Sequence, residues 1–302
     1  QTLWQACFWR VCMGVGAAFA TVSYLKLAAL WVPDKYYALV AGLLATAASG
    51  GAILGQAPLA ASVASVGWQQ TLFHCALMGV GLMLAYGLLV RDKPQVLHVS
   101  SNNHSLNASS WLCLVRFKRV WVLTLYSGLA WAPLAVFGGL WGNPFLQSAY
   151  HLSNTQSAEM VSIAFVGLAV GGPAWGLLAR NAKQVTSVMR LGLIVSLVSL
   201  ILVLYSPNHS IGALSVVLFT FGFGTGAFML GFTLGKQWCS VAMAASVVAL
   251  INTGDALMGA ISEPLVGKLL DHLWNGVMSH GVEQLSVSNF HLALALLPGY
   301  LF

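Results

Sequence analysis

Long apolar runs separated by shorter polar segments dominate the sequence. A helix needs about 20 apolar residues to cross the hydrocarbon core of a bilayer, and the complete runs are close to that length. Barrel strands would alternate apolar and polar residues over about ten positions, whereas these runs are continuously apolar. The pattern predicts an all-α integral membrane protein with nine spans, the ninth incomplete, at about 7–31, 36–61, 70–90, 120–141, 160–179, 185–205, 211–235, 241–266 and from 289.

One polar stretch, residues 91–119, is the longest of the breaks between runs. It carries Lys and Arg at both ends, and Ser and Asn in its middle. We interpret it as a connector that joins two membrane blocks, residues 1–90 and 120–302. This organisation favours a transport protein over a soluble enzyme.

The composition agrees with a chain immersed in lipid. Hydrophobic residues make up 58% of the 302 residues and charged residues 7%, whereas soluble proteins are about a quarter charged. The net charge of +6 does not indicate nucleic-acid binding, because the basic residues gather on one side of the predicted membrane. The five cysteines form no CxxC pair and mostly lie in or beside apolar runs. We therefore expect them to be small buried residues, with no metal site and no cofactor.

The basic residues orient the chain. Cytoplasmic segments of membrane proteins carry an excess of Lys and Arg. The opposite side of the predicted membrane holds Lys268, and Arg10 and Lys26 lie within the first run. The connector is therefore predicted to be cytoplasmic, together with the other segments that hold ten of the 13 basic residues: Lys35, Arg91, Lys93, Arg116, Lys118, Arg119, Arg180, Lys183, Arg190 and Lys236.

A weak internal repeat predicts how many spans are present. It consists of three residues that recur 210 positions later, namely Gly14, Gly16 and Lys26 as Gly224, Gly226 and Lys236. These two runs would be equivalent elements of two repeated halves. A cytoplasmic N-terminus requires an odd number of spans before the first run, and six spans follow the connector. We therefore expect a fragment that holds nine of twelve helices.

Three segments resemble motifs of the major facilitator superfamily. Arg10 to Phe19 (RVCMGVGAAF) resembles the fourth-helix motif of that family, an Arg followed by spaced glycines. Leu140 to Leu146 (LWGNPFL) and Gly171 to Gly176 (GGPAWG) resemble a bacterial branch that is grouped with lysosomal dipeptide and phagosomal amino-acid transporters. The resemblance implies a fold of two six-helix halves, and a monomer in the bacterial inner (plasma) membrane.

The same resemblance implies the domain boundaries. Residues 1–90 would be helices 4–6 of the first half, 91–119 the cytoplasmic connector, and 120–302 helices 7–12, with the last incomplete. The sequence departs from the family in the signature between helices eight and nine. There Arg180 stands where the family has an Asp that is thought to latch helices in one conformation.

Ionisable groups inside a membrane are costly and are functional candidates by default. Asp255 is near the middle of the 241–266 run, where desolvation favours the neutral carboxyl over the carboxylate. Glu263 is eight residues further on, which places both acids near one face of a helix. A proton path and a Glu that simply reaches the interface are both open for Glu263.

Other candidates follow from the resemblance. Arg10 matches the fourth-helix Arg, which would assist proton coupling or bind a substrate carboxylate. Lys26 is near the cytoplasmic end of its span and can reach the interface. Proton coupling is thus assigned to Asp255, Glu263 and Arg10, and substrate binding to Arg10, Tyr126, Trp131, Asn252 and Asp255. Structural roles remain open for each: an ion pair for Arg10, and packing for Tyr126, Trp131 and Asp255.

The favoured function is a proton-coupled secondary transporter of a small organic solute, with amino acids or short peptides implied by the resemblance. A drug/proton antiporter is the alternative, although Gln56 occupies a place where that pattern has small residues. The sequence shows no HExxH or GxSxG, which disfavours an enzyme. A permease driven by ATP would need a docking helix, and the short inner loops offer none that is obvious.

Overall fold

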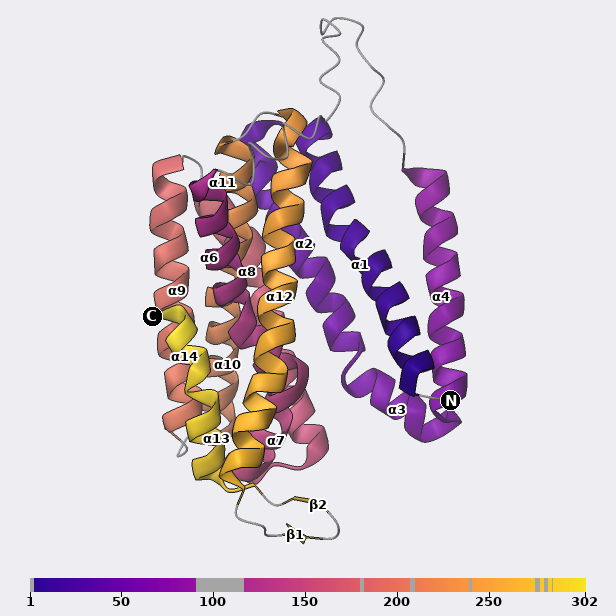
Figure 1. Ribbon diagram of the computed structural model, residues 1–302, viewed down its shortest axis with the longest axis vertical. Coiled ribbons are helices and arrows are strands. Elements are labelled where there is room, and N and C mark those ends of the chain that lie inside the picture. Colours follow the sequence, from indigo (N-terminus) through magenta and orange to yellow (C-terminus); the bar gives the residue numbers. More distant parts are fainter. Residues whose placement is uncertain are drawn as a thin grey trace, which may run out of the picture.

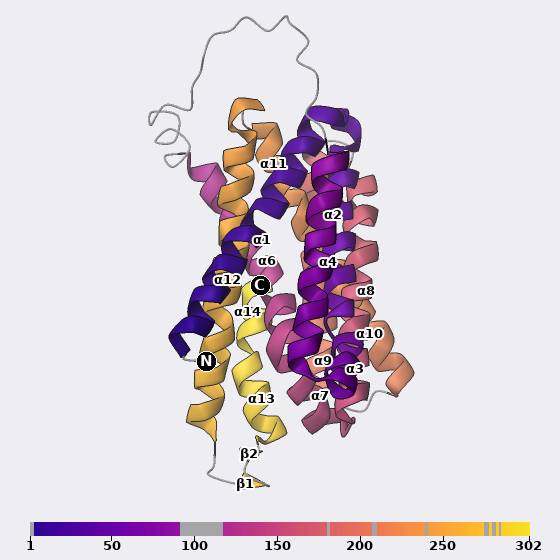
Figure 2. The ribbon, with the colours of Figure 1, turned by 90° about the vertical axis from the view of Figure 1, so that its right-hand side faces the viewer.

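The computed structural model describes residues 3–90, 117–179, 182–206, 210–238, 241–274, 278–279, 282–283 and 285–302. The described chain forms a helical bundle (Figure 1; Figure 2), in which eight helices are long and apolar enough to cross a membrane, followed by a shorter apolar helical segment at Val287–Leu301. The all-α prediction is confirmed. Residues 91–116 of the predicted connector lie outside the described residues, and so does Arg180.

The helices before the connector are here called the front block, and the elements after it the back block. The front block contains α1 (Leu3–Trp31), α2 (Asp34–Leu54), α3 (Ala57–Val66) and α4 (Trp68–Leu89). The back block contains α6 (Lys118–Val136), η1 (Phe137–Trp141), α7 (Gly142–Tyr150), α8 (Asn154–Leu178), α9 (Ala182–Tyr205), α10 (Ile211–Thr225), η2 (Gly226–Met229), α11 (Leu230–Trp238), α12 (Val241–Leu273), β1 (Met278–Ser279), β2 (Val282–Glu283), α13 (Val287–Leu294) and α14 (Leu296–Leu301).

The second predicted span, 36–61, was wrong as one continuous helix. The structure breaks it after Leu54, and α3 starts at Ala57 with Pro58 in its first turn. Proline lacks a backbone N–H and its ring clashes with the carbonyl four residues earlier, so α2 cannot continue through Pro58. Proline is tolerated in the first turn of a new helix, where that N–H would have no partner.

The predicted break between the runs 120–141 and 160–179 was also wrong. Helix α6 continues through the π-helical turn η1 into α7, which ends at His151 in a left-handed conformation (φ 55°). Pro144 supplies no N–H for the carbonyl of Leu140, which accounts for a widened turn at this point. Ser153 then caps α8: its Oγ accepts from the Gln156 backbone N–H at 3.2 Å, and Gln156 Oε1 accepts from the Ser153 N–H at 3.0 Å.

The break predicted between the run 241–266 and the last run, which was expected to start at 289, is shorter than expected. Helix α12 extends to Leu273, and the strands β1 and β2 form a small antiparallel hairpin within the remainder. The run 211–235 is likewise longer, ending at Trp238, and η2 interrupts it with a turn of 3₁₀-helix. These corrections move helix ends and leave the number of long helices unchanged.

Helix α8 joins the two blocks, because it packs along α2 on one side and along α10 on the other. The backbones meet at Gly172: a Cβ atom on Gly172 would lie 2.6 Å from the carbonyl oxygen of Gly42 in α2. From the back block, a Cβ on Gly226 would lie 2.6 Å from the backbone nitrogen of Gly172. The segment GGPAWG therefore acts as a packing surface on which three helices converge.

Two side chains also form hydrogen bonds between the front block and the back block. Thr46 Oγ1 donates to the Ala169 carbonyl oxygen at 2.6 Å, and Gln56 Nε2 donates to the Gly138 carbonyl oxygen at 3.3 Å. Gly138 belongs to the π-helical turn, where the regular helical ladder is disturbed and a carbonyl oxygen is available. Gln56, which departs from the small residues of the antiporter pattern, thus has a structural partner in the other block.

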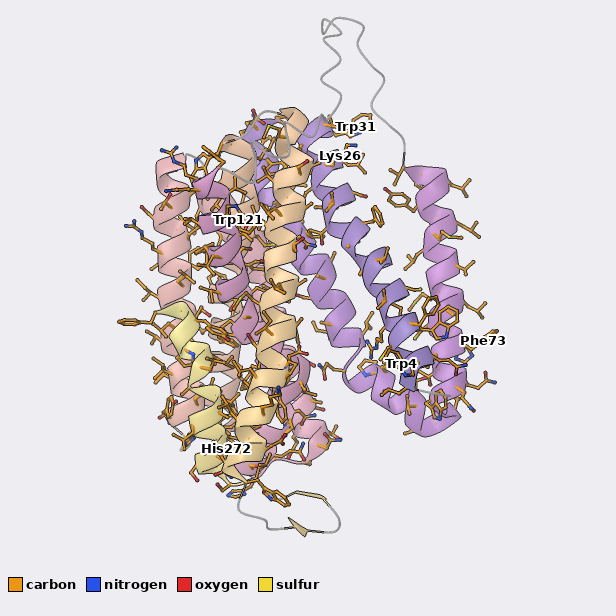
Figure 3. All side chains as sticks on the ribbon, in the orientation of Figure 1. Trp4, Lys26, Trp31, Phe73, Trp121 and His272 are labelled. Atoms are coloured by element: carbon orange, nitrogen blue, oxygen red, sulfur yellow. The ribbon has the colours of Figure 1, made fainter. Side chains whose placement is uncertain are left out.

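Helices α1 and α4 carry large exposed apolar side chains along much of their length, including Trp4 and Phe73 (Figure 3). An apolar surface of this extent fits an apolar surrounding and not water. Lys26 and Trp31 lie together near the end of the bundle where the connector attaches (Figure 3). This placement agrees with interfacial positions for both residues.

The contact between α2 and α8 gives a first prediction. Gly42→Ala places a methyl group against the backbone of Gly172 and Pro173, and we expect it to lower the free energy of unfolding by about 1–3 kcal/mol. Gly50→Ala on the same helix is the matched control, because a Cβ there meets nothing within 4 Å. Thermal unfolding in detergent measures both variants. Equal midpoints for the two would contradict the close contact of α2 with α8.

Candidate functional site

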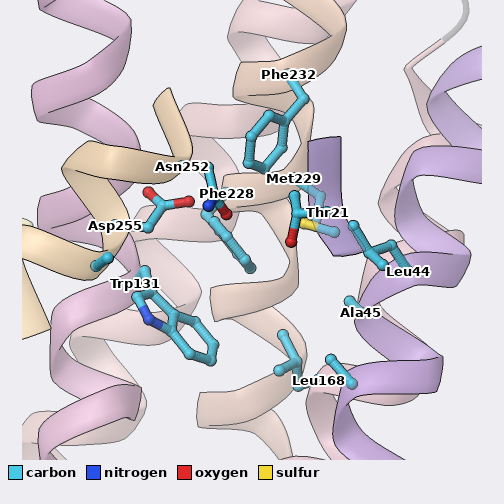
Figure 4. A pocket seen from close by; sticks show the side chains of 12 residues that line it. Thr21, Leu44, Ala45, Trp131, Leu168, Phe228, Met229, Phe232, Asn252 and Asp255 are labelled. Carbon is cyan, nitrogen blue, oxygen red and sulfur yellow. The ribbon is translucent and has the colours of Figure 1, made fainter. Parts of the chain in front are cut away.

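A cavity of about 230 Å³ lies where the two blocks meet (Figure 4). Its wall combines helices α1 and α2 of the front block with α6, α8, η2, α11 and α12 of the back block. Pockets for drug-sized ligands commonly measure about 300–1,000 Å³, so this cavity suits a small solute. The lining residues are Thr21, Leu44, Ala45, Ala48, Trp131, Leu168, Phe228, Met229, Phe232, Asn252, Asp255 and Ala256.

The aromatic part of the wall depends on a local break in the α10–α11 helix. The 3₁₀-helical turn η2 carries Phe228 and Met229, which both line the cavity. The ring of Phe228 stacks on that of Trp131 from α6, with centroids 5.2 Å apart and planes inclined by 30°. Phe232 lies on the same side of the cavity wall, one helical turn further along (Figure 4). The wall thus presents several rings beside its polar groups.

Asp255 is the ionisable residue on this wall. Its side chain is 7% exposed, and its Oδ1 atom has no hydrogen-bond partner among the described residues. Ser127 on α6 lies beside the carboxyl group, and its Oγ likewise has no hydrogen-bond partner in the described part of the chain. Figure 4 shows Asp255 and Asn252 pointing from α12 toward the cavity.

Two glycines bring Ser127 and Asp255 together. Helices α6 and α12 pack against each other, and a Cβ on Gly128 would lie 2.7 Å from the carbonyl oxygen of Gly254. A Cβ on Gly254 would in turn lie 2.7 Å from the carbonyl oxygen of Thr124. The backbones can approach this closely only because both positions lack a side chain. Asp255, next to Gly254 in the sequence, is thereby held against α6.

No basic residue compensates the charge of Asp255 in the described structure. The ion pair found there joins Lys236 and Asp34, which belong to α11 and α2. A buried carboxylate without a cation is strongly disfavoured, so such a group takes up a proton or binds a positively charged ligand. Asp255 is therefore a buried acid whose charge no described basic residue balances.

The structure brings together three of the predicted site residues. Trp131, Asn252 and Asp255 line the cavity. Tyr126 does not line it; its hydroxyl is buried without a partner in the described chain, and its ring lies near Gly231. Tyr126 is therefore near the residue that precedes Phe232 of the cavity wall.

Glu263 and Arg10 lie away from the cavity. Glu263 is half-buried, about 12 Å along α12 from Asp255, and its Oε1 lies against Gly139 of the π-helical turn. Its carbonyl oxygen accepts from Trp141 Nε1 at 3.1 Å. Arg10 is exposed on α1, about 16 Å along that helix from Thr21 on the cavity wall. Both roles assigned to these residues remain predictions.

Sequence reasoning missed several cavity residues. Thr21, Phe228 and Phe232 are on the wall, and Ser127 is next to Asp255. A signal existed for Phe228, because Gly226, the second glycine of the pair that repeats between the two blocks, is the first residue of η2. Thr21 and Ser127 lie in apolar runs where small hydroxyl residues are common, and nothing in the sequence marks them.

Membrane-length helices in two blocks, which meet around a cavity with a buried acid, define a multi-pass membrane protein of the transporter class. Residues 1–270 match the family model described as Major Facilitator Superfamily. The chain therefore belongs to this superfamily and has its fold. It is an integral membrane protein, and its family indicates a transporter rather than an enzyme.

One curated relative is a probable L-galactonate transporter of Escherichia coli (strain K12). It is 26% identical to this chain over 178 residues. The match covers 54% of this chain and 38% of the relative, so it spans well under half of that protein's length.

The cavity predicts a difference in reactivity between neighbouring positions. In a variant without the native cysteines, we expect Ala256→Cys to react with a water-soluble maleimide, because Ala256 lines the cavity. Leu257→Cys is the control, since Leu257 is 55% exposed on an apolar surface of the helix and should react slowly. Labelling rates in membranes measure both. A faster reaction at position 257 would contradict the assignment of the cavity face of α12.

Proposed function

We propose that this protein is a secondary active transporter that moves a small organic solute by alternating access and couples the movement to protons. The observation that carries the proposal is Asp255, a buried acid without a described basic partner, on the wall of a cavity formed by both blocks. Such a group binds and releases one positive charge as its access to water changes. Alternating access provides that change.

The proton path we propose follows α12. Glu263 is half-buried on the same helix, displaced from Asp255 toward the end of the bundle opposite the connector. A carboxyl at that position can pass protons between the cavity and the surface. Arg10 is proposed to assist this coupling through the front block, on the resemblance of its segment to the fourth-helix motif.

The solute we propose is an amino acid or short peptide. Its ammonium group would meet Asp255, the Asn252 amide would bond its polar atoms, and the stacked rings of Trp131 and Phe228 would contact its apolar part. Tyr126 is proposed as a second contact from α6. One carboxylate compensates one positive charge, so during uptake the ammonium group and the proton divide between Asp255 and Glu263.

A sugar acid is the second candidate, because the E. coli relative is a probable L-galactonate transporter. A protonated Asp255 and Asn252 could both hydrogen-bond to sugar hydroxyls, and Trp131 could stack on the carbon skeleton. The carboxylate of such a solute would need a basic residue, and Arg10 is the proposed one. Competition between labelled amino acids and L-galactonate separates the two solute classes.

The topology completes the proposal. Residues 1–90 form the rest of a first half and residues 120–302 most of a second, joined by a cytoplasmic connector at 91–119. We place the protein in the bacterial inner membrane as a monomer. The excess of Lys and Arg in segments on the connector side supports this orientation.

The direct test uses proteoliposomes with an imposed pH gradient and a mixture of amino acids and dipeptides. We expect Asp255→Asn to reduce gradient-driven uptake to the level of liposomes without protein, because an amide cannot take up a proton. Asp271→Asn is the matched control: it removes an acid from the exposed end of the same helix and should leave uptake unchanged.

Full gradient-driven uptake by Asp255→Asn would contradict the proposal. Efflux of hydrophobic cations in place of uptake would identify the antiporter alternative, in which Asp255 serves as the countercharge.

A further inference from the structure

Trp175 is the tryptophan of the segment GGPAWG in α8, and its indole group lies against α10. The side chain is 3% exposed, and its Nε1 atom donates a hydrogen bond of 2.7 Å to the backbone carbonyl oxygen of Phe223. The indole ring also packs on the ring of Phe223, with centroids 5.0 Å apart and planes inclined by 52°. Trp175 does not line the cavity. Any influence that it has on the cavity must therefore pass through α10.

The carbonyl group of Phe223 lies where α10 gives way to the turn η2. In a regular α-helix this carbonyl would accept from the backbone N–H of Ala227, four residues further on. The structure instead has a 3₁₀-helical turn over Gly226–Met229, a form in which each N–H bonds three residues back. A side chain that enters the backbone ladder of a helix is a known cause of such a local change. The indole N–H of Trp175 is a donor at this point, and it competes with the Ala227 N–H for the same oxygen.

Close contacts on both sides hold the segment before η2. On the α8 side, a Cβ on Gly171 would lie 2.8 Å from the Cα atom of Phe223, so the two backbones nearly touch. On the α9 side, the hydroxyl groups of Ser196 and Thr225 form a buried hydrogen bond with 3.0 Å between the oxygens. The turn η2 is thus held between α8 and α9, and Trp175 supplies the hydrogen bond on the α8 side.

The geometry of η2 determines which side chains face the cavity. A 3₁₀-helix has 3.0 residues per turn, so four residues turn by about 80° more, and rise by about 2 Å more, than in an α-helix. Phe228 and Met229 are in this turn, and both line the cavity (Figure 4). The ring of Phe228 stacks on that of Trp131 across the wall. Relaxation of η2 to an α-helix would take these side chains out of their present places.

We propose that Trp175 is a positioning residue, which holds η2 in its 3₁₀ form through the Phe223 carbonyl and thereby sets how tightly the cavity wall binds the apolar part of a solute. Trp175 does not touch the solute, and acts through Phe228 and Met229. The inference rests on the proposed function in one respect, namely that a solute binds in the cavity. It depends neither on the charged group of the solute nor on the proton.

The first test removes the donor and is independent of any solute. In the intact protein, Trp175 is replaced by benzothienylalanine, an amino acid in which sulfur takes the place of the indole N–H and the ring shape is kept. Met229→Cys and Ala256→Cys, each in a protein without native cysteines, report on η2 and on α12. We expect the rate of maleimide labelling at Met229→Cys to fall about fivefold, as for the loss of one buried hydrogen bond, and the rate at Ala256→Cys to stay unchanged.

A parental labelling rate at Met229→Cys would overturn the role of Trp175. If the protein with benzothienylalanine does not reach the membrane, Trp175→Phe decides by the same measurement, because phenylalanine also lacks the N–H donor.

The second test measures uptake of L-phenylalanine and glycine into proteoliposomes with an imposed pH gradient. We expect the loss of the Trp175 donor to raise the KM for L-phenylalanine about fivefold and to leave its Vmax unchanged, because contacts with the apolar side chain weaken. The KM for glycine should stay the same, since glycine has no side chain to contact the rings. A general loss of folded protein would instead lower Vmax for both solutes and leave both KM values unchanged, which would overturn the proposal.

Tyr150→Phe is the matched control. It removes a hydroxyl that donates to the Val203 carbonyl oxygen at 2.8 Å, in the same block and away from the cavity wall. Labelling and KM should equal the parental values, and an effect as large as that at Trp175 would contradict a specific role of η2. If the wild-type protein takes up neither solute, the proposed solute class is wrong, and the labelling of Met229→Cys still decides the role of Trp175.

Discussion

The fold depends on the close contact of α8 with α2 on one side and α10 on the other. Gly42, Gly172 and Gly226 allow three backbones to converge without side chains between them. Helices in lipid gain little from the hydrophobic effect when they associate, so packing of small residues supplies much of the attraction. This contact joins the front and back blocks, and it sets the width of the cavity that lies between α2, α8 and η2.

The same principle creates the site. Gly128 and Gly254 bring α6 and α12 together, which holds Asp255 beside Ser127 in a place shielded from lipid and largely from water. A carboxyl group there has no described basic partner, and its charge must be balanced by a proton or a ligand. The rings of Trp131 and Phe228 provide an apolar surface next to it. The close packing of glycines and the burial of Asp255 thus arise from the same helix contact.

Much of the fold could be predicted from the sequence, because span length and hydropathy have a direct physical cause in the thickness of the bilayer. The predicted helix ends failed where proline intervened. Pro58 splits one span, and Pro144 follows a π-helical turn that the apolar pattern did not reveal. Hydropathy reports burial in lipid, and it does not report the hydrogen-bond pattern inside a helix.

The site was predictable only in part. Asp255 could be found because a charge in mid-membrane is rare, and Trp131 and Asn252 also line the cavity. Thr21, Ser127 and Phe228 could not be distinguished from ordinary packing residues, since their role depends on which helix faces they occupy. Asp34 and Lys236 likewise have no local signal, because their contact joins segments about 200 residues apart.

The most direct test of the central claim is the movement of protons that accompanies the solute. A pH-sensitive dye inside proteoliposomes reports this movement when amino acids and dipeptides, or L-galactonate, are added outside without a pH gradient. We predict that the wild-type protein acidifies the interior as solute enters and that Asp255→Asn does not. Equal acidification by both proteins would show that the proton is carried elsewhere and would contradict the role of Asp255.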